Sequence, residues 1–187
     1  MQIYSLYILN KAGGLIYQND LNPGLARLSA NDYLVLAGTL HGVHAISTRI
    51  RAADLMVPKD DTNSVNSEIL LSGRPRLPNT NTLGLQHVDT DLFSLYVFQT
   101  LTGLKFVIVT SPPKHAANAR SGSQGELSRQ FDAVGSAYKQ FYQYYCDYVM
   151  KNPFYALDMP IKCAMFDGKV KAMASVQIGA WAAQFGD

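Results

Sequence analysis

The chain has 187 residues, of which 48% are hydrophobic, so we expect a single domain over residues 1–187 with a core large enough to be stable alone. Charged residues make up 16%, the net charge is +2, and no cluster of five Lys and Arg residues occurs, which excludes the usual basic surface for nucleic acid. So few charges favour a subunit that buries surface against partner proteins. The sequence lacks a long apolar run and a basic N-terminal region, so we expect neither a membrane span nor a signal peptide.

The first half of the chain predicts a β-hairpin, a helix and a long insertion. Residues 2–9 have the alternation of a strand, "NKAGG" supplies Asn and two glycines for a turn, and residues 15–18 return as the second strand. A helix is expected over about 31–52, where apolar residues recur at helical spacing after the capping residue Ser29 or Asn31. Residues 54–82 are rich in Pro, Asn, Ser, Thr and Asp and predict a long surface insertion within the domain.

The second half predicts a three-stranded meander between residues 83 and 111, followed by two helices. The third of these strands is apolar on both faces, which indicates a strand covered from both sides. Residues 112–129 read as a polar loop, and an aromatic stripe at helical spacing predicts an amphipathic helix over 130–151. The side chains that carry the last predicted helix are Val170, Met173, Ala174, Ile178 and Trp181. The fold is therefore α+β, with a five-stranded antiparallel sheet and the first strand in its middle, because the first helix must cross the sheet.

The sequence contains no arrangement that predicts catalysis, a cofactor or a metal site. Gly103 and Lys105 do not form the GxxxxGK(S/T) pattern of a phosphate-binding loop, and a strand comes next instead of a helix, so we interpret Gly103 as a hairpin turn residue. His41 and His44 lie three apart without an acidic partner on their helix, which favours hydrogen bonding at the helix edge over metal binding. The two cysteines stand at no zinc-binding spacing and are interpreted as buried reduced thiols, with a disulfide or a reactive thiol as alternatives.

The stretch "NPFYALDMPIKCAMFD", which begins at residue 152, predicts an extended segment between the last two helices, because its two prolines exclude a helix. Alternate large side chains are expected to point in opposite directions. The residues expected to point inward and hold the helices to the sheet are Phe154, Leu157 and Ile161. Those expected to face outward as a rigid docking surface are Tyr155, Met159 and Lys162.

Four stretches, "NKAGGLIYQ", "LAGTLHGVHAIS", "TDLFSLYVFQTLTGLKFV" and "NPFYALDMPIKCAMFD", resemble the synbindin family of TRAPP-complex subunits. The resemblance implies a longin (SNARE-like) domain, with one helix on one face of a five-stranded antiparallel sheet and two on the other. It implies a cytoplasmic subunit, peripheral to ER and cis-Golgi membranes and touching them only through the complex. The implied partners are a second longin subunit, palmitoylated-fold subunits and a Rab GTPase. Animal relatives carry a PDZ-like insertion before the first helix, which this chain lacks, so functions of that insertion are in doubt.

The resemblance also implies that the assembled complex is a guanine-nucleotide exchange factor in ER–Golgi traffic, while the chain alone is no enzyme and needs no cofactor. Exchange factors act by binding the nucleotide-free GTPase better than the nucleotide-bound form, which requires apolar anchors and oriented charges. We expect the GTPase to contact Tyr155, Met159, Lys162 and Asp167. Two alternatives are an architectural longin adaptor that binds coat or SNARE proteins without a GTPase, and a small enzyme with a site assembled from distant residues.

Overall fold

A computed structural model describes residues 2–50, 80–81, 84–112 and 123–185. The side chains of 80–81, 123–129 and 176–185 are not described, so Ile178 and Trp181 are placed by their backbone alone. Most of the predicted insertion at 54–82 lies outside the described residues. Thr80 and Asn81, at its end, form a short strand, so the insertion reaches the edge of the sheet.

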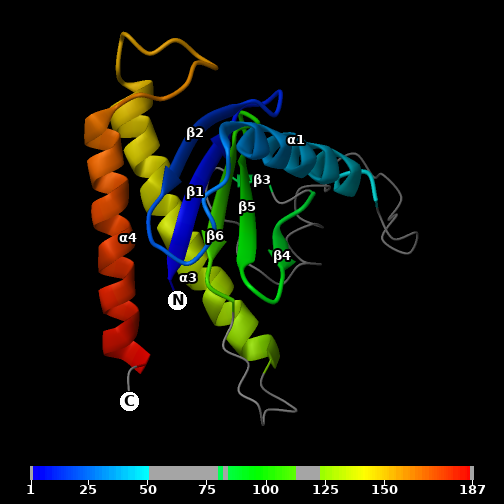
Figure 1. Cartoon of the computed structure of the whole chain (residues 1–187), viewed down its shortest axis with the longest axis vertical. Coiled ribbons are helices and arrows are strands. Elements are labelled where there is room, and N and C mark those ends of the chain that lie inside the picture. Colours follow the sequence, from blue (N-terminus) through cyan, green and yellow to red (C-terminus); the bar gives the residue numbers. More distant parts are fainter. Residues whose placement is uncertain (1, 51–79, 82–83, 113–122, 186–187) are drawn as a thin grey trace, which may run out of the picture.

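The core of the domain is an antiparallel sheet with five strand positions side by side (Figure 1). Two short strands, β3 and β4, both pair with β5, and together they occupy the fifth position. In spatial order the strands are β2 (Leu15–Asp20), β1 (Ile3–Leu9), β6 (Lys105–Thr110), β5 (Ser94–Thr100), and then β3 (Thr80–Asn81) with β4 (His87–Asp89).

The central position belongs to β6, not to β1 as the sequence predicted. β1 is nevertheless internal, because β6 inserts between it and β5 after the chain has crossed the sheet in the helix α1 (Ala30–Ser47). All six residues of β6 are buried, which confirms the prediction of a strand covered from both sides.

Alternation along the strands divides the core into two clusters, one on each face of the sheet. The helix α1 covers one face, where Tyr33 and Ala37 pack on the sheet. The opposite face carries α3 (Ser123–Tyr144), its continuation η2 (Tyr145–Met150) and α4 (Ala164–Phe185). Among the described residues, one helix lies on one face and two lie on the other, which confirms the predicted arrangement (Figure 1).

The helix boundaries differ from the predicted ones at three places. α1 begins after Ser29, whose hydroxyl accepts from the Asp32 amide at 3.3 Å in a capping box, but it ends at Ser47 and not near 52. α3 begins at Ser123, so the loop predicted over 112–129 is wrong for 123–129. That stretch is polar, and a helical turn without an apolar stripe gives no periodic signal. At its other end α3 passes into the π-helical turn η2, where the Lys151 amide donates to the Cys146 carbonyl at 3.1 Å.

Candidate functional site

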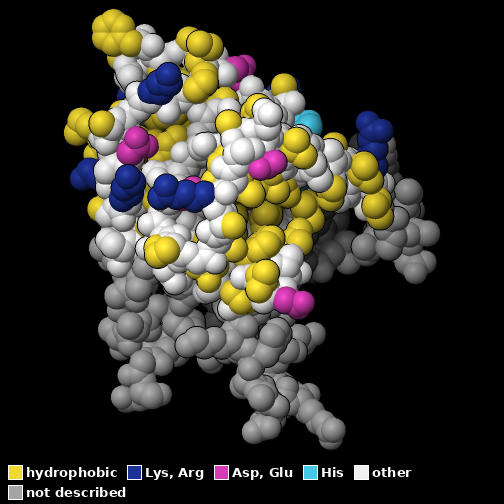
Figure 2. Space-filling view, viewed as in Figure 1, with side chains coloured by type: hydrophobic (Ala, Val, Ile, Leu, Met, Phe, Trp, Pro, Cys, Tyr) yellow, Lys and Arg dark blue, Asp and Glu magenta, His cyan; other side chains and the backbone are white. Residues whose placement is uncertain are grey.

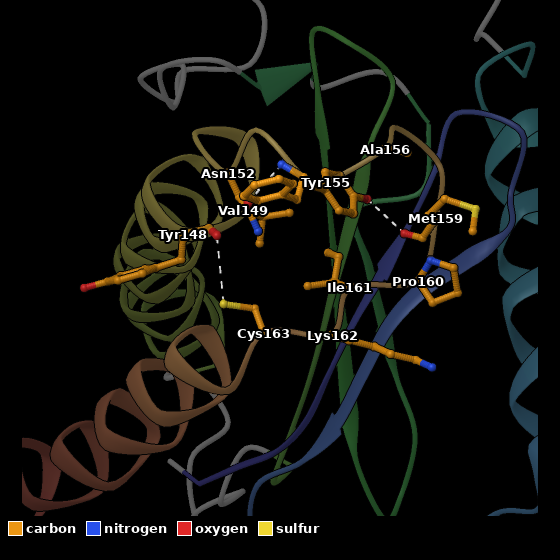
Figure 3. Close-up of a pocket in the computed structure, with 11 residues that line it drawn as sticks. Tyr148, Val149, Asn152, Tyr155, Ala156, Met159, Pro160, Ile161, Lys162 and Cys163 are labelled. Carbon is orange, nitrogen blue, oxygen red and sulfur yellow. Dashed lines mark hydrogen bonds between the residues drawn. The ribbon is translucent and has the colours of Figure 1, made fainter.

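The segment that connects η2 to α4, residues 152–163, is named here the ribbon, and two consecutive β-turns hold it (Figure 3). In the first turn the Tyr155 amide donates to the Asn152 carbonyl at 3.1 Å, with Pro153 at the second position, which suits its fixed φ. In the next turn the Met159 amide donates to the Ala156 carbonyl at 3.2 Å. The Tyr155 hydroxyl also donates to the Met159 carbonyl at 3.0 Å, so the two turns brace each other.

The two turns decide which ribbon side chains are exposed. Phe154 is 94% exposed and Leu157 is 71% exposed, so the prediction that they point inward is wrong. Both occupy central positions of β-turns, which project away from the body of the protein. Ile161 is buried as predicted, and its amide donates to the Ile16 carbonyl at 2.7 Å, so the ribbon covers part of the free edge of β2.

The structure divides the four predicted site residues into two pairs. Met159 and Lys162 are exposed. Tyr155 is half-buried against the core, so its predicted outward orientation is wrong, and burial raises the pKa of its hydroxyl. Asp167 lies in the first turn of α4 and accepts from the hydroxyl of Tyr17 at 2.7 Å. Tyr155 and Asp167 therefore hold the ribbon and α4 in place, whereas Met159 and Lys162 are free to meet a partner.

A pocket of about 270 Å³ lies between η2 and the ribbon (Figure 3). Its lining residues are Tyr148, Val149, Asn152, Phe154, Tyr155, Ala156, Met159, Pro160, Ile161, Lys162 and Cys163. The Cys163 thiol donates to the Tyr148 carbonyl at 3.9 Å, and both cysteines are free thiols. The sequence did not predict this pocket, because it depends on the π-helical turn, which has no recognised sequence signal here.

A second exposed apolar surface runs along the outer side of α1 (Figure 2). Its large side chains are Leu34, Val35, Val43 and Ile46, which are 58%, 67%, 45% and 62% exposed. We call these four residues the α1 outer face. Helices on a protein surface usually carry charged residues on the side away from the core, and here the α1 outer face is apolar instead.

The sequence of α1 differs from that of an ordinary surface helix in its lack of charges and in its two glycines. Residues 33–48 contain no Asp, Glu, Lys or Arg, a signal from which the outer face could have been predicted. Val43 is one of the residues that recur at helical spacing in this stretch, and it is exposed. Gly38 and Gly42 lie on the same helix, and a Cβ added at either would meet no atom within 4 Å, so the backbone of α1 is open to close approach there.

Polar groups are buried on the inner side of α1. The ring of His44 contacts the Leu85 carbonyl at 3.2 Å and the Gln99 side chain, which confirms hydrogen bonding for this histidine. Lys105 is 5% exposed, its amine donates to the Gly103 carbonyl at 3.4 Å, and burial lowers its pKa. Within the described ranges, no three His, Cys, Asp or Glu side chains come together as metal ligands.

The chain is similar in sequence to the members of one protein family along most of its length. Residues 3–177 match the sequence profile of the Sybindin-like family. "Trafficking protein particle complex subunit 4" of Dictyostelium discoideum is 33% identical over 95% of this chain and 99% of its own. The human protein of that name is 29% identical over 94% of this chain and 95% of its own. "Trafficking protein particle complex subunit 1" of Dictyostelium discoideum is 26% identical over 88% of each chain.

Myxococcus xanthus MglB, a solved structure, aligns with 73% of this chain and 84% of its own at 14% identity and a TM-score of 0.33. In the part of the chain that the structure describes, no helix combines the length and the apolar character needed to span a membrane.

Proposed function

The chain belongs to the Sybindin-like family, and from this premise we propose that it is a core subunit of a TRAPP-type tethering complex in ER–Golgi vesicle traffic. The near full-length similarity to proteins named as subunit 4 of such a complex supports the proposal. The structural observation that carries it is the α1 outer face, because an uncharged apolar helix surface is typical of a protein that is buried against partners.

The α1 outer face binds another small TRAPP subunit in this proposal, and we assign it to a second longin subunit. Permanent interfaces resemble a domain core cut in half, with large apolar residues and few charges at their centre. Four exposed aliphatic side chains beside two accessible glycines have this composition. Palmitoylated-fold subunits complete the complex. The complex is cytoplasmic and peripheral to ER and cis-Golgi membranes, and this chain meets the membrane only through it.

The ribbon contributes to the platform on which the complex stimulates guanine-nucleotide exchange on a Rab GTPase. Its two braced turns hold apolar side chains in fixed, exposed positions, and preorganised anchors of this kind lose little entropy on binding. Met159 and Lys162 contact the GTPase, while Tyr155 and Asp167 support the surface from behind. The chain itself performs no covalent chemistry, because exchange is a matter of differential binding.

Charge reversal tests the ribbon assignment. Lys162→Glu is introduced into the reconstituted complex, and the release of a fluorescent guanine nucleotide from the Rab GTPase is followed. We expect exchange to slow while assembly, checked by size-exclusion chromatography, is unchanged. Lys139→Glu, a reversal at an exposed position of α3, is the matched control and should leave exchange unaffected.

The alternative is an architectural adaptor that binds coat or SNARE proteins without touching a GTPase. A complex that lacks this subunit and still binds the GTPase and exchanges its nucleotide at the full rate would favour the adaptor.

A further inference from the structure

The pocket between η2 and the ribbon has room for one large side chain. Its volume is about 270 Å³. Val149 and Ile161 are buried at its base and Tyr155 is half-buried in its wall. An apolar side chain placed there would contact atoms that are already ordered.

The walls of the pocket are preformed. On one side the π-helical turn ends with the bond from the Lys151 amide to the Cys146 carbonyl, and π-helical turns are frequent at functional sites. On the other side the two β-turns of the ribbon are braced by the Tyr155 hydroxyl. The thiol of Cys163 links the sides through the Tyr148 carbonyl (Figure 3). Because hydrogen bonds within the protein hold both walls, binding costs little reorganisation.

The rim of the pocket carries one cation. Lys162 is the one charged residue among those that line it, and Asp158, although close by on the ribbon, is not among them. Lys169 and Lys171 are exposed on the adjoining turns of α4, beside the carboxylate of Asp167, which accepts a hydrogen bond from Tyr17. Figure 2 shows Lys and Arg side chains over α4 and the ribbon, with Asp and Glu side chains among them. A partner segment that carries carboxylates is therefore attracted to this rim.

We propose that the pocket receives one aliphatic or aromatic side chain from an acidic segment of the GTPase, with Lys162 facing a carboxylate beside that side chain. This inference rests on the proposed function, which brings the GTPase to the ribbon, and it adds the point of insertion. The exposed side chains of Phe154 and Met159 at the rim close around the inserted group and exclude water, as contacts around interface hot spots do.

A pocket-filling variant tests the insertion. Ala156→Phe places a ring at a lining position that is exposed and contributes only its carbonyl to the turn. Ala172→Phe, on an exposed position of α4 outside the pocket, is the matched control. In the reconstituted complex we expect Ala156→Phe to weaken the binding of a Rab GTPase, stripped of nucleotide with EDTA, by about thirtyfold, the scale of one hot-spot contact. The control should bind normally.

A second readout is independent of any change in the pocket's shape. The rate at which iodoacetamide alkylates Cys163, read by peptide mass spectrometry, should fall when the nucleotide-free GTPase is bound, because the inserted side chain covers the thiol. The half-buried Cys146 is not a lining residue, and its rate should not change.

The results of these experiments distinguish failure of the side-chain insertion from failure of the proposed function. Normal binding by Ala156→Phe with no protection of Cys163, while Lys162→Glu still weakens binding, would overturn the insertion and leave the ribbon as the GTPase surface. If Lys162→Glu, Met159→Ala and Ala156→Phe all bind normally, the GTPase does not meet the ribbon, and both proposals fail together.

Discussion

Lys105 is the most unusual single residue of the core. It lies at the start of β6 opposite Leu9 and Gln99, on the face of the sheet that α1 covers. Its amine has one long hydrogen bond, at 3.4 Å, to the Gly103 carbonyl, and no partner carboxylate among the described residues is recorded for it. Burial lowers the pKa of this amine because the charged form loses its hydration. A buried cation with so little compensation reduces the stability of the fold.

The first prediction concerns this lysine. Lys105→Met keeps the aliphatic chain and removes the charge, so we expect the free energy of unfolding to rise by about 1 kcal/mol. Urea titration followed by circular dichroism measures the change. Lys169→Met, at an exposed position, is the control and should alter stability by less than about 0.5 kcal/mol. A loss of stability in Lys105→Met would show that the buried amine makes contacts that outweigh its desolvation.

Among the elements, the β1–β2 hairpin has a turn that packs against the helix α1. The Asn10 amide donates to the Gly14 carbonyl at 2.8 Å, and Gly13 has a φ of +90°, a conformation that strongly favours glycine. A Cβ at Gly13 would lie 2.5 Å from Cγ of His41 on α1. The turn is therefore constrained twice, by its own backbone and by the helix that packs on it.

The second prediction follows from these two constraints. Gly13→Ala should lower the free energy of unfolding by about 2 kcal/mol, because the strained φ and the contact with His41 act together. The matched control is Gly168→Ala on α4, where an added Cβ meets no atom within 4 Å and helix propensity should raise stability by about 0.5–1 kcal/mol. Thermal and urea unfolding of both variants measure the difference. Equal effects of the two substitutions would refute the argument from turn geometry.

At the scale of the molecule, the described residues present two exposed apolar surfaces on different elements. The α1 outer face belongs to the helix that covers one side of the sheet, and the ribbon joins the two helices that cover the other side (Figure 1). A subunit with two such surfaces can contact two proteins at once. This separation predicts that damage to the α1 outer face affects assembly, whereas damage to the ribbon affects binding of the GTPase.

The third prediction tests the α1 outer face in the isolated chain and in the complex. Val35→Lys with Ile46→Lys should make the purified chain less prone to self-associate, because two exposed aliphatic side chains become charged, and should prevent its incorporation into the complex. Size-exclusion chromatography with light scattering measures both effects. Leu92→Lys with Leu101→Lys changes two side chains that are 74% and 75% exposed elsewhere, and this control should assemble normally. Normal assembly of the α1 variant would rule out the face as a subunit interface.

Local sequence patterns determined most of the framework. Alternation, turn glycines and helical spacing are properties of neighbouring residues, and they predicted the first hairpin, the meander, the Gly103 turn and the amphipathic helix. The resemblance to longin subunits added the placement of the helices on the two faces. Of the candidate site, the exposure of Met159 and Lys162 agreed with the prediction.

Only the tertiary structure decided which large side chains are covered, because burial depends on segments that are distant in the sequence. Phe154 and Leu157 are as apolar as core residues, yet two consecutive turns carry them outward, and α1 is apolar on both sides although the sheet covers one. The insertion of β6 between β1 and β5, and the pocket that a π-helical turn forms with the ribbon, likewise arise from pairings across the fold. The sequence by itself determined the elements and their order, and the packing of those elements determined the surfaces that remain for partners.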